Sequence, residues 1–398
     1  MTKQIQDAYI VAAVRTPIGK APRGVFRNTR PDDLLAHVIR AALARTPVID
    51  PQRIGDVIVG CAMPEAEQGM NVARIGLLLA GLPDTVPGVT VNRFCSSGAQ
   101  AVAMAADRIR LGEADLMLAC GTESMSMVPM MGHRPAINPA VFDSEHVAIA
   151  YGMGITAEKV AERWKVSRED QDAFALQSHQ RALAAIGAGE FADEIAPYTL
   201  DDRYPDLATH ATKADQRRID TDEGPRKDTS LDGLAKLKAV FRSGGSVTAG
   251  NSSQMSDGAG AVLLASAQAI KDYGLTPLAR FVGASVAGVP PEIMGIGPKE
   301  AIPRALKLAG IRRDQLDWIE LNEAFAAQSL AVIRDLGLDP AKVNPLGGAI
   351  ALGHPLGATG AKLTATVVHG LRRRKQKYGM VTMCIGTGMG YAMVLEAV

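Results

Sequence analysis

The stretch Val91-Asn-Arg-Phe-Cys-Ser-Ser-Gly-Ala-Gln-Ala-Val-Ala-Met104 places one cysteine between a predicted strand and a predicted helix. Residues 86–92 have a strand pattern. The Ala-rich sequence from Ser96 onward has a helical pattern, and its serine hydroxyls are available to the first free N–H groups. The positive end of a helix dipole stabilises a thiolate. Cys95 is therefore a candidate nucleophile, and the alternative is a buried cysteine that acts as a small apolar side chain.

Strand and helix patterns alternate on both sides of Cys95. Apolar runs at 8–14, 56–60 and 115–121 predict buried strands, and helical patterns lie between them at 31–42 and 71–82. This alternation predicts an α/β domain with a largely parallel sheet. A second series follows, with strand patterns at 258–265, 279–286, 318–321, 380–384 and 391–395 and helical patterns at 302–309 and 324–335.

Residues 123–246 differ in character from both series. They contain a Met-, Pro- and Gly-rich segment at 125–139, a long helical pattern at 167–191 and a charged segment at 197–227. We predict that they form an insertion outside the sheet. Their basic side chains either meet phosphate groups or form a solvated face; they include Lys213, Arg217, Arg218, Arg226 and Lys227.

The parts of the chain that flank the insertion repeat one pattern. Val91-Asn-Arg-Phe-Cys, a helix and Leu116-Met-Leu-Ala-Cys-Gly-Thr122 have a counterpart in Val343-Asn-Pro-Leu-Gly, a helix and Val381-Thr-Met-Cys-Ile-Gly-Thr387. The repeat predicts two copies of one α/β unit. The predicted units are an N-terminal half, residues 1–122 with 247–275, and a C-terminal half, residues 276–398.

Composition narrows the class of protein. The chain has 398 residues, 47% of them hydrophobic and 21% charged, which is typical of a globular protein of two or three domains. A formal net charge of +1 argues against a nucleic-acid partner. The sequence contains neither an apolar run long enough to span a bilayer nor the apolar core of a signal peptide, so we expect a cytoplasmic protein. Its four scattered cysteines lack metal-site spacings and are expected to be free thiols.

Three further positions are candidates for chemistry. His354 lies in the glycine-rich stretch 347–360, which permits close backbone approach and would aim the imidazole at a thiol; a structural or surface histidine is the alternative. Cys384 ends a buried strand before a glycine turn, where the N–H of Gly386 could face an oxyanion; the alternative is a plain strand-end cysteine. Asn322 ends a strand at the sheet edge where ligands gather, or it caps a helix.

These stretches together resemble the thiolase family of acyl-CoA acetyltransferases. The resemblance rests on five motifs in the family's order, namely Asn92-Arg-Phe-Cys-Ser-Ser-Gly98, Thr248-Ala-Gly-Asn-Ser-Ser253, Asn322-Glu-Ala-Phe325, Gly353-His-Pro-Leu-Gly-Ala-Thr-Gly360 and Cys384-Ile-Gly386. It implies the thiolase fold, in which two similar βαβαβαββ halves form a five-layered αβαβα structure with an inserted loop domain that binds CoA.

The resemblance also implies a role for each candidate. Cys95 matches the nucleophile that takes the acyl group, His354 the base that activates it, and Cys384 the acid/base that serves the acetyl-CoA carbon and the CoA thiol. The N–H groups of Cys95 and Gly386 match one oxyanion hole, and His354 with a water held by Asn322 matches a second. The resemblance implies CoA and acyl-CoA as substrates, with no metal and no permanently bound cofactor.

Further residues match contacts to CoA. Arg226 matches a residue against the adenine end, Ser253 a contact to the pantetheine arm, and Met153 and Met294 positions that line the acyl pocket; Ala249 and Phe325 complete the set. The chain departs from the family where Cys-Ile-Gly-Gly-Gly-Gln-Gly is usual, because Thr387 and Met389 replace Gly and Gln, and Ala99 stands where Leu is common.

The resemblance predicts a transferase that cleaves 3-ketoacyl-CoA with CoA, in a reversible Claisen reaction. The motifs Arg-Phe-Cys-Ser-Ser-Gly and Asp-Glu-Gly-Pro-Arg226 favour the degradative type of fatty-acid β-oxidation over a biosynthetic acetoacetyl-CoA thiolase, as does the absence of a His-Met pair at Met153. A non-catalytic acyl-CoA or lipid-binding protein and a papain-like cysteine hydrolase are the rival classes. A homodimer or homotetramer is expected, with a possible β-oxidation partner subunit, and chain length is left open.

Overall fold

The computed structural model describes residues 5–143 and 145–398, so the first four residues of the terminus that suggested a cytoplasmic protein lie outside it. Within the described residues, ten strands form one large sheet in the order β10-β11-β12-β9-β1-β8-β5-β3-β4, with β2 beside β8. The strands of the first half are β1 (Ala8–Arg15), β2 (Gly19–Lys20), β3 (Ile54–Gly60), β4 (Gly88–Val91), β5 (Leu116–Ser124) and β8 (Ser256–Ser266). Those of the second half are β9 (Ala279–Gly288), β10 (Trp318–Leu321), β11 (Tyr378–Ile385) and β12 (Met389–Ala397).

The two halves of this sheet have the same strand order. In the first half, without the short β2, the strands lie side by side in the order β4-β3-β5-β8-β1. If the strands of this half are numbered one to five along the chain, this order is 3-2-4-5-1. The second half runs β10-β11-β12-β9, and Val343 forms a parallel bridge to Ile319 where a third strand would lie. In both halves the second strand is parallel to the third and fourth, and the fifth is antiparallel to the fourth and first. The predicted repeat of one α/β unit is therefore confirmed.

The prediction of a largely parallel sheet is wrong, because β8 and β12 run antiparallel to both neighbours. β12 follows β11 through the short turn Gly386-Thr387-Gly388, and a connection of this length can only join antiparallel strands. An antiparallel pairing of Ala8–Ile10 in β1 with Ala279–Phe281 in β9 joins the two halves into one sheet.

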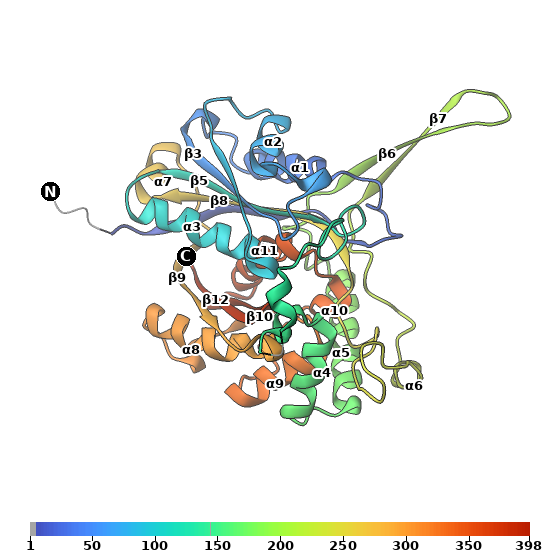
Figure 1. Ribbon diagram of the computed structural model, residues 1–398. Helices are drawn as coiled ribbons and strands as arrows, with labels where there is room; N and C mark the ends of the chain where they lie inside the picture. Colours follow the sequence, from blue (N-terminus) through green and yellow to red (C-terminus); the bar gives the residue numbers. More distant parts are fainter. Residues whose placement is uncertain (1–4, 144) are drawn as a thin grey trace.

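Helices form three layers around the two halves of the sheet (Figure 1). The helices α1 (Pro31–Ala44) and α2 (Val72–Leu79) cover the outer face of the first half, and α8 (Gly297–Ala309) and α9 (Ala326–Leu336) cover that of the second. Between the halves lie α3 (Ser97–Arg110) and α11 (Leu356–Arg374). The result is the predicted five-layered αβαβα structure.

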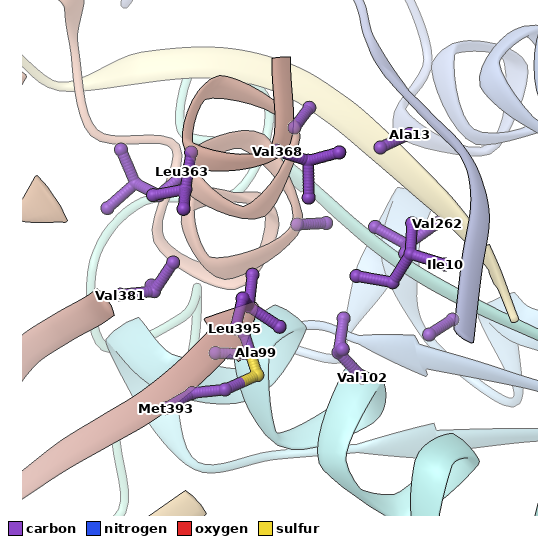
Figure 2. Close-up of a cluster of buried hydrophobic side chains, with 14 of the residues drawn as sticks. Ile10, Ala13, Ala99, Val102, Val262, Leu363, Val368, Val381, Met393 and Leu395 are labelled. Atoms are coloured by element: carbon purple, nitrogen blue, oxygen red, sulfur yellow. The ribbon is translucent and has the colours of Figure 1, made fainter. Parts of the chain in front are cut away.

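The central layer forms the largest apolar core (Figure 2). Ala99 and Val102 of α3 and Leu363 and Val368 of α11 pack there against side chains from both halves of the sheet, among them Val262, Val381 and Met393. The two helices approach closely, since a Cβ on Gly360 would collide with the backbone of Ala99. The alanine at position 99, one of the departures from the family pattern, thus lies at a tight helix contact.

The segment between β5 and β8 builds structure outside the large sheet. It contains the helices α4 (Met153–Arg163), α5 (Arg168–Gly187) and α6 (Leu231–Ala235) and the hairpin of β6 (Tyr198–Pro205) and β7 (Thr212–Ile219), which projects from the body (Figure 1). The remaining helices are α7 (Ala267–Tyr273) and α10 (Ala349–Leu352). The domain limits 1–122, 123–246, 247–275 and 276–398 stay predictions. No helix among the described residues combines the length and hydrophobicity needed to cross a membrane.

Candidate active site

Cys95 lies in a single 3-10 turn, Phe94–Ser96, between β4 and α3. Phe94 adopts a φ of +45°, a strained backbone conformation that turns the chain directly before the cysteine. The serines do not cap α3 as expected. Ser97 Oγ instead accepts the N–H of Arg93 at 2.8 Å and donates to the Phe94 carbonyl at 2.6 Å. These bonds hold the turn that carries Cys95.

Burial dominates the electrostatics of Cys95. It raises the pKa of the thiol to about 11, although the backbone N–H groups of Gly386 and of Cys95 itself act in the opposite direction. The helix N-terminus, which favours a thiolate, therefore does not by itself make this thiol acidic. Two N–H donors from different halves do converge on the sulfur, and such a pair can also stabilise an oxyanion formed beside it.

Cys384 is the penultimate residue of β11 and is almost fully buried. Burial raises the pKa of its thiol, and the proximity of Cys95 adds to the increase. Its apolar neighbours are Met153, Met294 and Phe325, together with Ala157, Val247 and Ala324. The Cys95 and Cys384 sulfurs thus occupy one site. Three of the residues expected to contact the substrate, Met153, Met294 and Phe325, surround Cys384.

The hydrogen bonds of His354 fix its tautomer. Its Nδ1 lies 2.6 Å from the hydroxyl of Thr359. Its Nε2 faces Asn322 Nδ2, an amide nitrogen that can only donate, so Nδ1 carries the proton and donates it to Thr359. Nε2 therefore carries the lone pair, and it accepts from Asn322 Nδ2 at 3.2 Å. Burial, followed by the charge of Lys362, lowers the pKa of His354 to about 3. The imidazole is a neutral base at physiological pH.

Asn322 holds one unused acceptor. Its Oδ1 is buried without a hydrogen-bond partner among the described residues, while its N–H donates to the Thr382 carbonyl. The alternative of a helix cap is wrong, because α9 begins only at Ala326. A free acceptor beside His354 suits the water expected there.

A cavity of about 450 Å³ opens beside Cys95. On the side of the reactive cysteine, this cavity is lined by Cys95, Gly386, Thr387 and Met153. The rest of its wall is mostly apolar and includes Met63, Met130, Met131, Ile137, Ile149, Tyr151 and Leu356. Glu65 is the one charged side chain of this lining, which has no Lys or Arg among the described residues.

Other predicted CoA contacts lie around a second cavity of about 260 Å³. Arg226 and Ala249 line it, and the N–H of Arg226 donates to His179 Nδ1 at 3.2 Å. Ser253 donates its N–H to the Ala324 carbonyl at 2.9 Å, which places it next to the Asn322-Glu-Ala-Phe325 motif. The structure thus separates Arg226 and Ala249 from the set around Cys384.

Sequence reasoning missed the residues that hold the histidine loop. Ser256 Oγ accepts the backbone N–H of His354 at 3.1 Å, and Thr359 binds its Nδ1. Glu123 accepts from the N–H groups of Gly357 at 2.8 Å and of Ala62 at 2.7 Å, which ties the loop to the first half. Thr359 lies in a motif that the sequence had singled out, whereas Ser256 and Glu123 carry no local signal.

Comparison with known proteins agrees with this geometry. Residues 8–268 match the family "Thiolase, N-terminal domain" and residues 275–397 match "Thiolase, C-terminal domain". The chain is 52% identical to a 3-ketoacyl-CoA thiolase of Bacillus subtilis, over 98% of this chain and 100% of that protein. It is 47% identical to a beta-ketoadipyl-CoA thiolase of Acinetobacter baylyi, over 99% and 100%.

The fold also matches a solved structure. The crystal structure of the Bacillus anthracis acetyl-CoA acetyltransferase superimposes with a TM-score of 0.89 at 40% identity, with 100% of both chains covered. The matched domains, the full-length relatives and the shared fold all point to one conclusion: this chain belongs to the thiolase family.

Proposed function

We propose that the protein is a 3-ketoacyl-CoA thiolase that uses CoA to release acetyl-CoA and a shortened acyl-CoA. The observation that carries the proposal is the convergence of two sulfurs, Cys95 and Cys384, with the N–H of Gly386. We assign to them, as the base, the neutral imidazole of His354, which is bound to Asn322. Each half of the molecule contributes part of this set. A binding protein needs no such combination, and a papain-like hydrolase needs no second cysteine.

The first step is acylation of Cys95. A thiol with a pKa of about 11 is protonated at neutral pH, so attack requires a base. His354 Nε2 carries the lone pair that takes this proton, in place of the hydrogen bond that it accepts from Asn322 Nδ2. The Cys95 sulfur bonds to the 3-keto carbon, and the carbonyl oxygen becomes an oxyanion that the N–H groups of Cys95 and Gly386 stabilise. When the bond between C2 and C3 breaks, Cys95 carries the acyl group as a thioester.

The leaving group is the enolate of acetyl-CoA. Asn322 and His354 stabilise its oxygen, through the water for which Asn322 Oδ1 has a free acceptor position. Cys384 gives its proton to the C2 carbon, which completes acetyl-CoA and leaves a thiolate. Burial raises the pKa of Cys384, so this sulfur holds its proton until a strong base forms beside it.

The second step returns the enzyme to its starting state. The Cys384 thiolate takes the proton of an incoming CoA thiol, and the CoA sulfur attacks the thioester on Cys95. The shortened acyl-CoA leaves, and Cys95 regains its proton from His354. Thiolysis is thus divided into a carbon–carbon cleavage that forms the Cys95 thioester and one thioester exchange with CoA.

The large cavity favours an aliphatic acyl chain over the alternatives. Its volume of about 450 Å³ exceeds what the methyl end of acetoacetyl-CoA requires. A chain that ends in a carboxylate, as in beta-ketoadipyl-CoA, would meet Glu65 without a cation among the lining residues. A biosynthetic acetoacetyl-CoA thiolase remains the alternative function.

Steady-state thiolysis of three substrates tests the proposal. We expect kcat/KM for 3-ketooctanoyl-CoA to exceed the values for acetoacetyl-CoA and for beta-ketoadipyl-CoA by about tenfold or more. A strong preference for acetoacetyl-CoA would reverse the choice of function. Intact-mass spectrometry should detect an acyl adduct on the wild-type protein that Cys95→Ala abolishes.

The position of CoA, the assembly and the location belong to the same proposal. The adenine end of CoA lies near Arg226 and Ala249, and the pantetheine arm runs past Ser253 toward Cys384.

Two exposed apolar side chains favour a homodimer or homotetramer. Val89 lies on the edge strand β4, and Met70 lies beside this strand. Sedimentation at micromolar concentration would identify the assembly. The cytoplasmic location and the partner subunit of β-oxidation stay predictions.

A further inference from the structure

Lys362 is a buried cation that the reaction above does not use. It lies in the second turn of α11 and is 1% exposed. Its Nζ donates to the carbonyl of Gly353 at 2.9 Å and approaches that of Leu352 at 3.4 Å. These are the two residues directly before His354. A lysine is almost never buried without a specific set of partners, so this placement calls for a role.

The backbone at this point needs an external donor. α10 ends at Leu352, and the last carbonyls of a helix have no partner within it. Gly353 then reverses the chain with a φ of +84°, where a Cβ would collide with Ser256 Oγ. The ammonium group satisfies both carbonyls and fixes the direction in which the chain enters His354.

The charged groups around Lys362 come from three parts of the fold. Lys362 is faced by Arg15 of β1, by Asp222 and Glu194 of the segment between β5 and β8, and by Glu320 of β10. Arg15 is already bound to Glu194 at 2.6 Å and to Asp222 at 2.7 Å. Burial raises the pKa of Glu320 to about 8, so its carboxyl is mostly neutral at pH 7. No ion pair to Lys362 occurs among the described residues.

We propose that Lys362 is a positioning residue, which orients His354 through the carbonyls of Leu352 and Gly353 and acts on its imidazole through its positive charge. The inference rests on the proposed role of His354 as the base. The charge disfavours a second proton on the imidazole, in the same direction as burial, which is the larger effect. Lys362 thereby helps to keep Nε2 unprotonated, so that it can accept the proton of Cys95.

Three variants separate orientation from charge. Lys362→Met removes both the donor and the charge, Lys362→Arg keeps both, and Lys362→Gln keeps a donor without the charge. Thr364→Val is the matched control, because Thr364 is buried on the same helix and its hydroxyl, within the described part of the chain, binds only the carbonyl of Gly360. Each purified protein is first checked for folding by thermal unfolding.

The protonation of His354 is followed by NMR of the imidazole nitrogens between about pH 2 and 6, a range that includes its lowered pKa of about 3. Removing a nearby positive charge raises a histidine pKa, so we expect the midpoint to move upward by about one pH unit in Lys362→Met and Lys362→Gln. Lys362→Arg and Thr364→Val should titrate like the wild type. We expect kcat to fall about tenfold or more in Lys362→Met, with partial recovery in Lys362→Gln and the KM for CoA unchanged.

Unchanged titration in folded Lys362→Met and Lys362→Gln would overturn the inference, as would equal loss of kcat in Lys362→Arg and Lys362→Met. The NMR titration does not depend on turnover. If the wild type lacked thiolase activity, the proposed function would fail, whereas an unshifted titration would overturn the role of Lys362 alone.

Discussion

The two α/β halves share one strand order, but they connect the fourth strand to the fifth in opposite ways. In the first half, β5 and β8 are separated by the whole of residues 125–255, which supplies much of the cavity wall. In the second half, β11 turns into β12 within Gly386, Thr387 and Gly388. The long connection lines the cavity beside Cys95, and the short one presents a backbone donor to Cys95.

This difference divides the chemistry between the halves. The first half holds Cys95 on a strained turn after its third strand. The second half holds Cys384, His354 and the N–H of Gly386. Duplication of one scaffold thus produces a site that neither half would form alone, and each variant below changes one side of that division.

The largest expected effect comes from the sulfur of the second half. Cys384→Ser replaces a proton donor by a much weaker acid in the same volume, so we expect kcat for thiolysis to fall by about 10³ or more. Acylation of Cys95 should persist and be detectable by mass spectrometry. Cys120→Ser, in the fourth strand of the first half, is the control and should retain turnover. Unchanged turnover in Cys384→Ser would refute the assignment.

The contact between the halves is tested by Gly360→Ala. The added Cβ would collide with the backbone of Ala99 on α3, which cannot move without shifting the central layer. We expect a loss of about 3 kcal/mol in the free energy of unfolding, measured in urea. Gly187→Ala adds a methyl group to a helix where nothing lies within 4 Å, and it should be neutral or slightly stabilising.

The share of activation that belongs to His354 is tested by alkylation of Cys95 with iodoacetamide. Because burial holds the pKa of Cys95 at about 11, we expect the rate at pH 7 to fall about 100-fold in His354→Ala. Below that pKa the thiolate fraction of the variant rises tenfold for each pH unit, so its rate should climb steeply from pH 7 to 10. A near-normal alkylation rate of His354→Ala at pH 7 would contradict this expectation and would mean that the helix N-terminus and the N–H donors activate Cys95.

The smallest effect concerns the turn of the second half. Thr387 has a φ of +65°, which costs a β-branched residue about 1–2 kcal/mol, and the family usually has glycine there. Thr387→Gly should raise the free energy of unfolding by about 0.5–1 kcal/mol, since relief of strain exceeds the added entropy of the unfolded chain. Thr382→Val, on the extended strand β11, should not stabilise the protein. A loss of stability in Thr387→Gly would mean that the hydroxyl contact to the Gly386 carbonyl matters more than strain.

Local patterns predicted the elements well, because burial and periodicity are local properties. The strand at 318–321 and the helix that begins at Pro31 agree with β10 and α1. Strand direction was not predictable in the same way, since β8 pairs with β1 and β5, which are far from it in sequence. The fifth strands therefore proved antiparallel against expectation.

The motifs predicted the residues of the candidate site, but they did not predict the pKa values of these residues. The residue types at positions 95, 354 and 384 suggested their chemistry, but the pKa of Cys95 depends on neighbours that only the fold assembles. Similarly, the donor that fixes Gly353 is Lys362 of α11, and the charges that face Lys362 come from β1, β10 and the segment after β5. Roles that arise from convergence of distant segments leave no local signal.

The pairing of β1 with β8 and β9 has a consequence for synthesis of the chain. Ala8–Arg15 leaves the ribosome first, but its partners begin only at Ser256 and Ala279. At about 5–20 residues per second, this apolar strand waits tens of seconds for its neighbours. Non-local pairing of this kind slows folding and exposes unpaired strands. The nascent protein should therefore depend on chaperones far more than the finished one.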